Sequence, residues 1–88
     1  MSSELLKLKA QMTAVAKDAT GMASALGSLR RRLETSAKLA DGQVRGTAQQ
    51  QRYQAMIVSY QQAAKACEDA AQALVKAGRA GTDIGQSL

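Results

Sequence analysis

The sequence has no proline, tryptophan, phenylalanine or histidine, and only two tyrosines and one cysteine. So little aromatic content makes a β-sheet a poor prospect. A single cysteine, Cys67, excludes an internal disulfide, and without histidine there is no metal-binding cluster. The abundant residues, Ala, Leu, Gln, Lys and Arg, are those that favour helices. Eighty-eight residues of this composition predict one small all-α domain.

One stretch of the chain, residues 4–33, carries an uninterrupted heptad pattern. Its apolar residues follow one another in alternating steps of three and four, which predicts a helix made to lie against another helix. We call this set the leucine seam. It consists of Leu5, Leu8, Met12, Val15, Ala19, Met22, Leu26, Leu29 and Leu33.

The middle of the chain carries its one turn signal, Asp41–Gly46. We expect the first helix to cover about residues 4–40 and to end at Gly42 in a left-handed C′ conformation. Thr47 and Gln50 then form a Thr-x-x-Gln capping box, so a second helix should cover about residues 47–79. A short connection between long helices predicts an antiparallel two-helix hairpin, residues 1–79, which we expect to assemble into a four-helix bundle.

The second helix carries two overlapping apolar stripes. The first predicted stripe is Tyr53, Ile57, Tyr60, Ala64, Cys67, Ala71 and Leu74, and the second is Met56, Tyr60, Ala63, Cys67, Ala70 and Leu74. The breadth of this face suggests that the helix contacts more than one neighbour. We interpret the tyrosines as packing residues and Cys67 as a small buried apolar side chain. Glycines after Leu74 predict fraying, with a flexible tail over residues 80–88.

Two further features concern partners. Gly21, Ser24 and Ser28 lie away from the leucine seam and form a candidate second interface, although an exposed helix also tolerates such residues. The net charge of +5 raises nucleic acid as a partner. However, the basic residues are scattered among acids, and the one run, Arg30–Arg32, spreads around the helix, so the pattern argues against nucleic acid.

Catalytic groups are missing from the pattern. The sequence has no His, no facing carboxylate pair and no phosphate-binding glycine loop, so we predict no enzyme activity and no cofactor. No apolar run is long enough for a membrane span, and no signal peptide is visible, so we expect synthesis in the cytoplasm. Protein association through the apolar faces is the expected function.

The turn and the second helix carry a family resemblance. The chain resembles the WXG (early-secreted-antigen-like) proteins of bacterial type VII secretion, small helical hairpins whose turn carries Trp-x-Gly. Here the corresponding turn is Val44-Arg45-Gly46, which keeps the glycine and lacks the tryptophan. Aromatic and apolar residues then follow at the family's seven-residue spacing, at Tyr53, Tyr60, Cys67 and Leu74.

The resemblance implies a targeting partner that binds the helical N-terminal region of a secreted toxin or a second small hairpin. The family's Tyr-x-x-x-Asp/Glu export signal is absent, because Ile57 follows Tyr53 by four residues and Ala64 follows Tyr60. A partner chain would then complete the signal, and this chain could itself be secreted. Two alternatives stay open: a polymerising subunit like a type III needle hairpin, and a cytoplasmic helical regulator.

Overall fold

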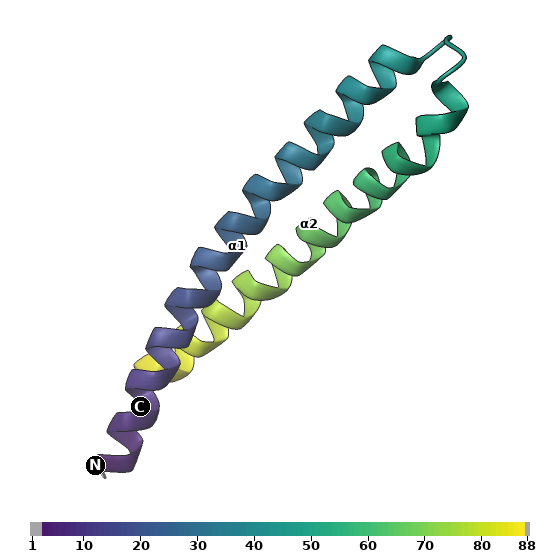
Figure 1. Cartoon of the computed structure of the whole chain (residues 1–88). Helices are drawn as coiled ribbons and strands as arrows, with labels where there is room; N and C mark the ends of the chain where they lie inside the picture. Colours follow the sequence, from purple (N-terminus) through teal and green to yellow (C-terminus); the bar gives the residue numbers. More distant parts are fainter. Residues whose placement is uncertain (1–2, 88) are drawn as a thin grey trace. The chain divides into compact units, whose positions relative to one another are not determined.

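The protein is a hairpin of two α-helices in a computed structural model that describes residues 3–87 (Figure 1). Helix α1 covers Ser3–Val44 and helix α2 covers Gln50–Ser87. Residues 45–49 connect them, and no residue from 3 to 87 forms a strand. The predicted all-α helical hairpin is therefore confirmed.

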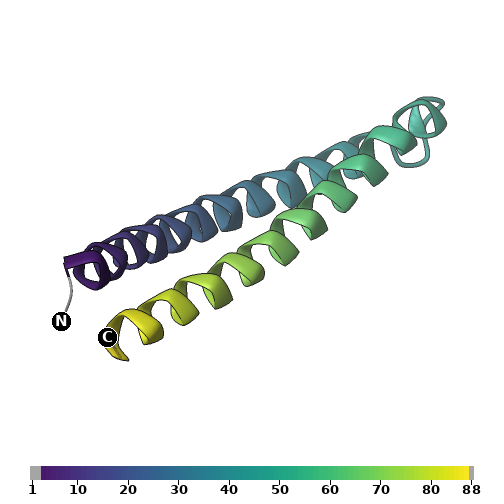
Figure 2. The same cartoon turned by 90° about the horizontal axis from the view of Figure 1, so that it is seen from below.

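Contacts between the helices divide the chain into two compact units. The terminal unit pairs the start of α1, up to Ala25, with the end of α2, from Ala70 onward. The turn unit is Leu26–Asp69, which includes the connection. In the terminal unit the last turns of α2 lie beside the first turns of α1 in both views (Figures 1 and 2).

The connection begins later than we predicted. Helix α1 continues through Gly42, and the backbone N–H of Arg45 still donates to the Asp41 carbonyl at 2.9 Å. The left-handed residue is Gly46, with φ of +76°, and not Gly42. A mid-helix glycine costs only about 1 kcal/mol relative to alanine, so Gly42 does not force the helix to stop.

The predicted capping pair forms, but each hydrogen bond is shifted by one residue. The N–H of Gln49, rather than that of Gln50, donates to Thr47 Oγ1 at 3.2 Å. The N–H of Gly46, rather than that of Thr47, donates to Gln50 Oε1 at 3.0 Å. Helix α2 accordingly begins at Gln50 and not at Thr47. The two side chains still satisfy backbone donors at the start of the helix, which is the purpose of such a box.

The terminal unit buries a face of α1 that coincides with the leucine seam only in part. The buried side chains are Ala16, Ala19 and Ala23. Val15 and Met22, which belong to the seam, are 65% and 60% exposed. The helix is therefore turned so that small residues, spaced by three and four, face α2. The reason lies in α2, whose opposing residues are glycines.

The end of α2 is helical to Ser87, so our prediction of a tail from Ala80 is wrong for residues 80–87; Leu88 lies outside the described residues. Gly78, Gly81 and Gly85 continue the spacing of the first stripe beyond Leu74. A Cβ at Gly78 would lie 3.2 Å from the Ala16 carbonyl oxygen, and one at Gly81 would lie 3.5 Å from the Ala16 Cβ. These glycines therefore allow close backbone approach instead of ending the helix.

The turn unit has a core of larger side chains. Ile57 is 1% exposed and is the largest fully buried side chain of the described residues. Ala37, Ala64 and Cys67 are buried with it, so the interpretation of Cys67 as a small buried apolar residue is confirmed. Leu26 and Leu33 of α1 are half-buried in this unit. Here the leucine seam does contribute to the packing of the hairpin.

Candidate partner-binding surface

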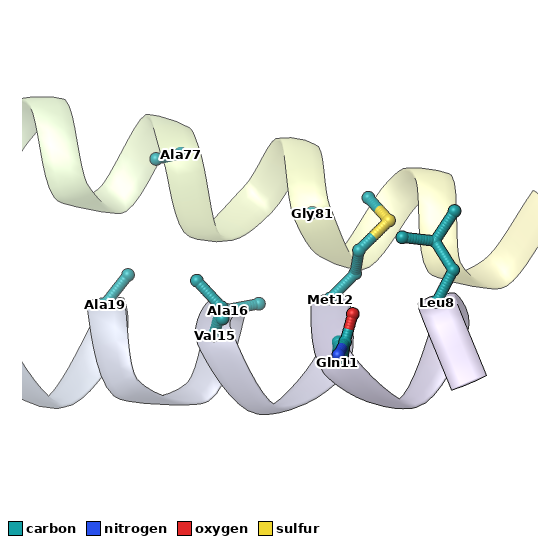
Figure 3. A pocket seen from close by; sticks show the side chains of 8 residues that line it. All are labelled: Leu8, Gln11, Met12, Val15, Ala16, Ala19, Ala77 and Gly81. Carbon is teal, nitrogen blue, oxygen red and sulfur yellow. The ribbon is translucent and has the colours of Figure 1, made fainter.

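An apolar groove runs between the two helices of the terminal unit, with a volume of about 310 Å³ (Figure 3). The side chains of Met12 and Leu8 point toward the backbone of α2 around Gly81, and Val15 stands beside Ala16. The groove is lined by Leu8, Gln11, Met12, Val15, Ala16, Ala19, Ala77 and Gly81.

Two large exposed side chains, Leu8 and Val15, line the α1 side of this groove, and Met22 continues their row beyond it. Leu8, Val15 and Met22 recur every seven residues and are 45%, 65% and 60% exposed. We call these three residues the outer row. They belong to the leucine seam and remain exposed while Ala16, Ala19 and Ala23 face α2. A row of this kind on a small protein is a candidate surface for a second helix.

Small exposed side chains form the α2 side. Four alanines follow one another in steps of three, four and three, and all are exposed; Ala77 lines the groove itself. We call them the alanine row: Ala70, Ala73, Ala77 and Ala80. Ile84, seven residues after Ala77, extends this face and is half exposed. Alanines allow the axis of another helix to come close. Both sides of the groove are apolar, and they differ in the size of their side chains.

Charged residues stand at the outer edges of the groove. Asp18 follows the groove residue Gln11 by two turns, so it lies on the outer edge of α1. On α2, Gly78 and Lys76 flank the groove residue Ala77. Because Gly78 faces α1, Lys76 lies on the opposite, outer edge of α2. Both are exposed, and within residues 3–87 neither forms an ion pair.

The ion pairs that do form each lie along a single helix, within the turn unit. Arg30 pairs with Glu34 at 3.0 Å, Lys65 with Asp69 at 3.2 Å, and Arg45 with Asp41. The hydrogen bond and the negative charge of Asp69 raise the pKa of Lys65, with a further contribution from Glu68. This is the behaviour of an exposed helix-surface pair and stabilises the protonated lysine.

The turn unit has a second apolar depression, of about 500 Å³, at the end of the hairpin. Val44, Tyr53 and Met56 line it together with backbone and polar groups of the connection. Val44 is the last residue of α1, and it comes directly before Arg45 and the left-handed Gly46. Arg45 and Gly46 are themselves exposed.

The residues we predicted to pack or to bind a partner divide by exposure. Buried are Ile57 and Cys67; half-buried are Met12, Leu26, Leu33, Met56 and Leu74; exposed are Leu5, Leu8, Val15, Met22, Leu29, Tyr53 and Tyr60. Gly21, Ser24 and Ser28 are exposed, and nothing lies within 4 Å of a Cβ at Gly21. Their role as a second interface stays a prediction.

The sequence analysis did not predict the alanine row as a surface, although the second stripe that it predicted on the second helix contained Ala70 and Met56. The signal was present, because the same three-and-four spacing continues through Ala73, Ala77, Ala80 and Ile84. It was hidden by the glycines that follow Leu74, which suggested that the helix frays there. Gly78, Gly81 and Gly85 were missed for the same reason.

No protein-family model, curated protein or solved structure matches this chain. In the part of the chain that the structure describes, no helix is long and apolar enough to cross a membrane. Residues 3–87 also hold no group of three or more His, Cys, Asp or Glu residues arranged to bind a metal ion. We therefore take the groove of the terminal unit as the candidate functional site.

Proposed function

We propose that this protein is a small helical partner protein that binds another helical chain through the groove of the terminal unit. The exposure of the outer row carries the proposal. Covering a side chain such as Leu8, Val15 or Met22 contributes about 1.5–3 kcal/mol of favourable transfer free energy when burial is complete. The protein leaves this apolar surface in water, and a partner helix would cover it.

We further propose that the binding serves type VII export. The support is the WXG resemblance together with the position of Gly46, whose positive φ lies in the connection where that family carries its motif glycine. The chain lacks the Tyr-x-x-x-Asp/Glu signal at Tyr53 and Tyr60. In this proposal the partner, a toxin N-terminal region or a second hairpin, supplies the signal, and this chain supplies the complementary helical face.

Co-expression with the product of the adjacent gene tests the binding. Met22→Glu places a charge on the outer row, seven residues after the groove residue Val15, and Ala14→Glu places the same charge on an exposed residue outside both the outer row and the groove. We expect co-purification with the wild type and with Ala14→Glu, and its loss with Met22→Glu. Equal co-purification of all three proteins would contradict binding through the groove.

Export has its own test. Secretion of the partner into the medium is measured in cells with and without this chain. The proposal expects export to require the chain and to fail with Met22→Glu. Export of the partner at the same level in cells that lack this chain would contradict a role in targeting.

A further inference from the structure

We propose that the outer face of α1 in the turn unit carries a binding site for a phosphate monoester. Two arginines and two hydroxyl residues line an open depression of about 280 Å³ there. We call these residues the arginine-hydroxyl cluster: Arg31, Arg32, Thr35 and Ser36. The cluster belongs to α1 alone and lies outside the groove of the terminal unit, so the inference does not depend on the proposed function.

The cluster faces away from α2. Ala37 is 3% exposed and belongs to the core of the turn unit. Thr35 precedes it by two residues, which is a rotation of roughly 200° around the helix. All four residues of the cluster are exposed, so a ligand reaches them from solvent without displacing the other helix.

The charges of the cluster have no internal partner. Among residues 3–87 neither of its arginines forms an ion pair, and Arg31 Nη2 donates only to the neutral Ser28 Oγ, at 3.3 Å. The carboxylates of α1 in the turn unit pair with other arginines, Glu34 with Arg30 and Asp41 with Arg45. Lys38, three residues after Thr35, is also unpaired in this part of the chain and lies beside the cluster. The outer face thus presents cations without an opposing carboxylate.

The hydroxyl of Thr35 is also available to a ligand. The other threonines of residues 3–87 donate their hydroxyls to backbone carbonyls: Thr13 to Lys9, Thr20 to Ala16, Thr47 to Val44 and Thr82 to Gly78. Such bonds are the usual arrangement for a threonine within a helix, and Thr35 forms none. Because side chains four residues apart are neighbours on a helix, Thr35 lies beside Arg31 and Ser36 lies beside Arg32. Guanidinium and hydroxyl donors therefore converge on one place.

The donor set and its charge fit a phosphate monoester. Such a group carries a charge of about −1.5 to −2 at neutral pH and has three acceptor oxygens, which two guanidinium groups and two hydroxyls can match. A single carboxylate would compensate only one of the arginines. The cluster also covers only about 8 Å of the helix, which suits one compact group and not the track of phosphates in a nucleic acid.

Titration of the isotope-labelled full chain with inorganic phosphate at about pH 7, followed by NMR, tests the proposal. We expect backbone amide shifts over residues 28–38 that saturate with a dissociation constant of about 1–10 mM. Acetate at the same ionic strength should bind at least about tenfold more weakly, since it carries one charge. Shifts that do not saturate, or that acetate reproduces equally, would reveal a solvated basic face only and overturn the site.

Two pairs of variants locate the binding. Arg32→Gln should weaken phosphate binding by about tenfold, whereas Lys76→Gln removes the same charge from the terminal unit and should change it by less than about twofold. Thr35→Val should weaken binding by about threefold. Thr13→Val, whose hydroxyl is engaged by the Lys9 carbonyl, should leave it unchanged. Circular dichroism checks that each variant stays helical, and equal effects within either pair would overturn the assigned residues.

A second ligand identifies the source of the phosphate group. A short phosphoserine peptide that binds more tightly than inorganic phosphate, and loses this binding with Arg32→Gln, assigns the site to a modified side chain of another protein. Equal affinity of the two ligands assigns it to a small phosphorylated compound, and both results support the site. A phosphoserine peptide that binds no better than its unphosphorylated form would overturn the proposal.

Discussion

The two units of the hairpin pack by different means. The turn unit buries Ile57 and Cys67, with Leu26 and Leu33 half-buried, so its helices meet through ordinary apolar side chains. The terminal unit buries Ala16, Ala19 and Ala23 of α1 against glycines of α2, beginning at Gly78. Where backbones approach this closely, large side chains have no room between the helices and remain outside.

This difference explains why large residues beside the close contact of the terminal unit stay exposed. Ile57, in the core of the turn unit, is 1% exposed. Val15, beside the close contact at Ala16, is 65% exposed. Small residues at the contact between the helices thus leave large residues of the leucine seam exposed. Variants in each unit test this contrast.

The largest effect is expected at the core of the turn unit. Ile57→Ala removes the one fully buried large side chain there and should lower the free energy of unfolding by about 2–5 kcal/mol. Val58→Ala, at an adjacent residue that is 37% exposed, should cost less than about 1 kcal/mol. Urea unfolding followed by circular dichroism measures both, and equal losses would contradict the assigned core.

The next effect is expected at the close contact of the terminal unit. Gly78→Leu places a side chain where even a Cβ lies 3.2 Å from backbone, so it should destabilise the protein by about 1–3 kcal/mol. Gly21→Leu, on an open surface, should instead stabilise it by up to about 1 kcal/mol through helix propensity. If thermal melts show Gly78→Leu to be as stable as Gly21→Leu, the helices do not approach closely at Gly78.

A smaller effect is expected at the connection. Gly46→Ala forces an L-residue to a φ of +76° and should cost about 1–2 kcal/mol. Gly42→Ala lies within α1 and should stabilise the protein by up to about 1 kcal/mol. The two unfolding free energies should therefore move in opposite directions. The reverse order would restore Gly42 as the left-handed residue.

The smallest effect is expected at the exposed pair of Lys65 and Asp69. Because the pKa of Lys65 is raised above its ordinary value of 10.5, the pair stabilises the fold below that pH, and this contribution disappears as pH rises through the folded-state pKa. Asp69→Asn should lower the pKa of Lys65 in an NMR titration of its side chain. At pH 7 the urea midpoint should not change measurably, since the pair is solvent-exposed.

Much of the fold could be predicted from the sequence because its signals are local. Heptad spacing, the absence of proline and the turn at Asp41–Gly46 predict two antiparallel helices, as observed. The exact ends could not be predicted, because a glycine such as Gly42 permits a helix end without requiring one. Gly85 illustrates the same ambiguity. Considered within α2 alone, a glycine weakens the helix, and only the nearby α1 explains why a glycine occupies this position.

The candidate site could be predicted only in part. Periodicity identified Val15 and Met22 as apolar members of the leucine seam. However, a second face of α1, displaced by one residue, fits the same three-and-four spacing. The choice between Val15 and Ala16 depends on what the opposite helix carries at the same level, which is Gly81 and its neighbours. Spacing within one helix does not contain that information. The resemblance to WXG proteins implied a partner without locating the surface.

The most direct test of this account compares adjacent residues of α1. Val15→Cys and Ala16→Cys, each combined with Cys67→Ser, are labelled with a thiol reagent in dilute protein. The account predicts rapid labelling at residue 15 and slow labelling at residue 16, since Val15 is 65% and Ala16 is 6% exposed. Equal labelling at both positions, or protection of residue 15 in dilute protein, would contradict it.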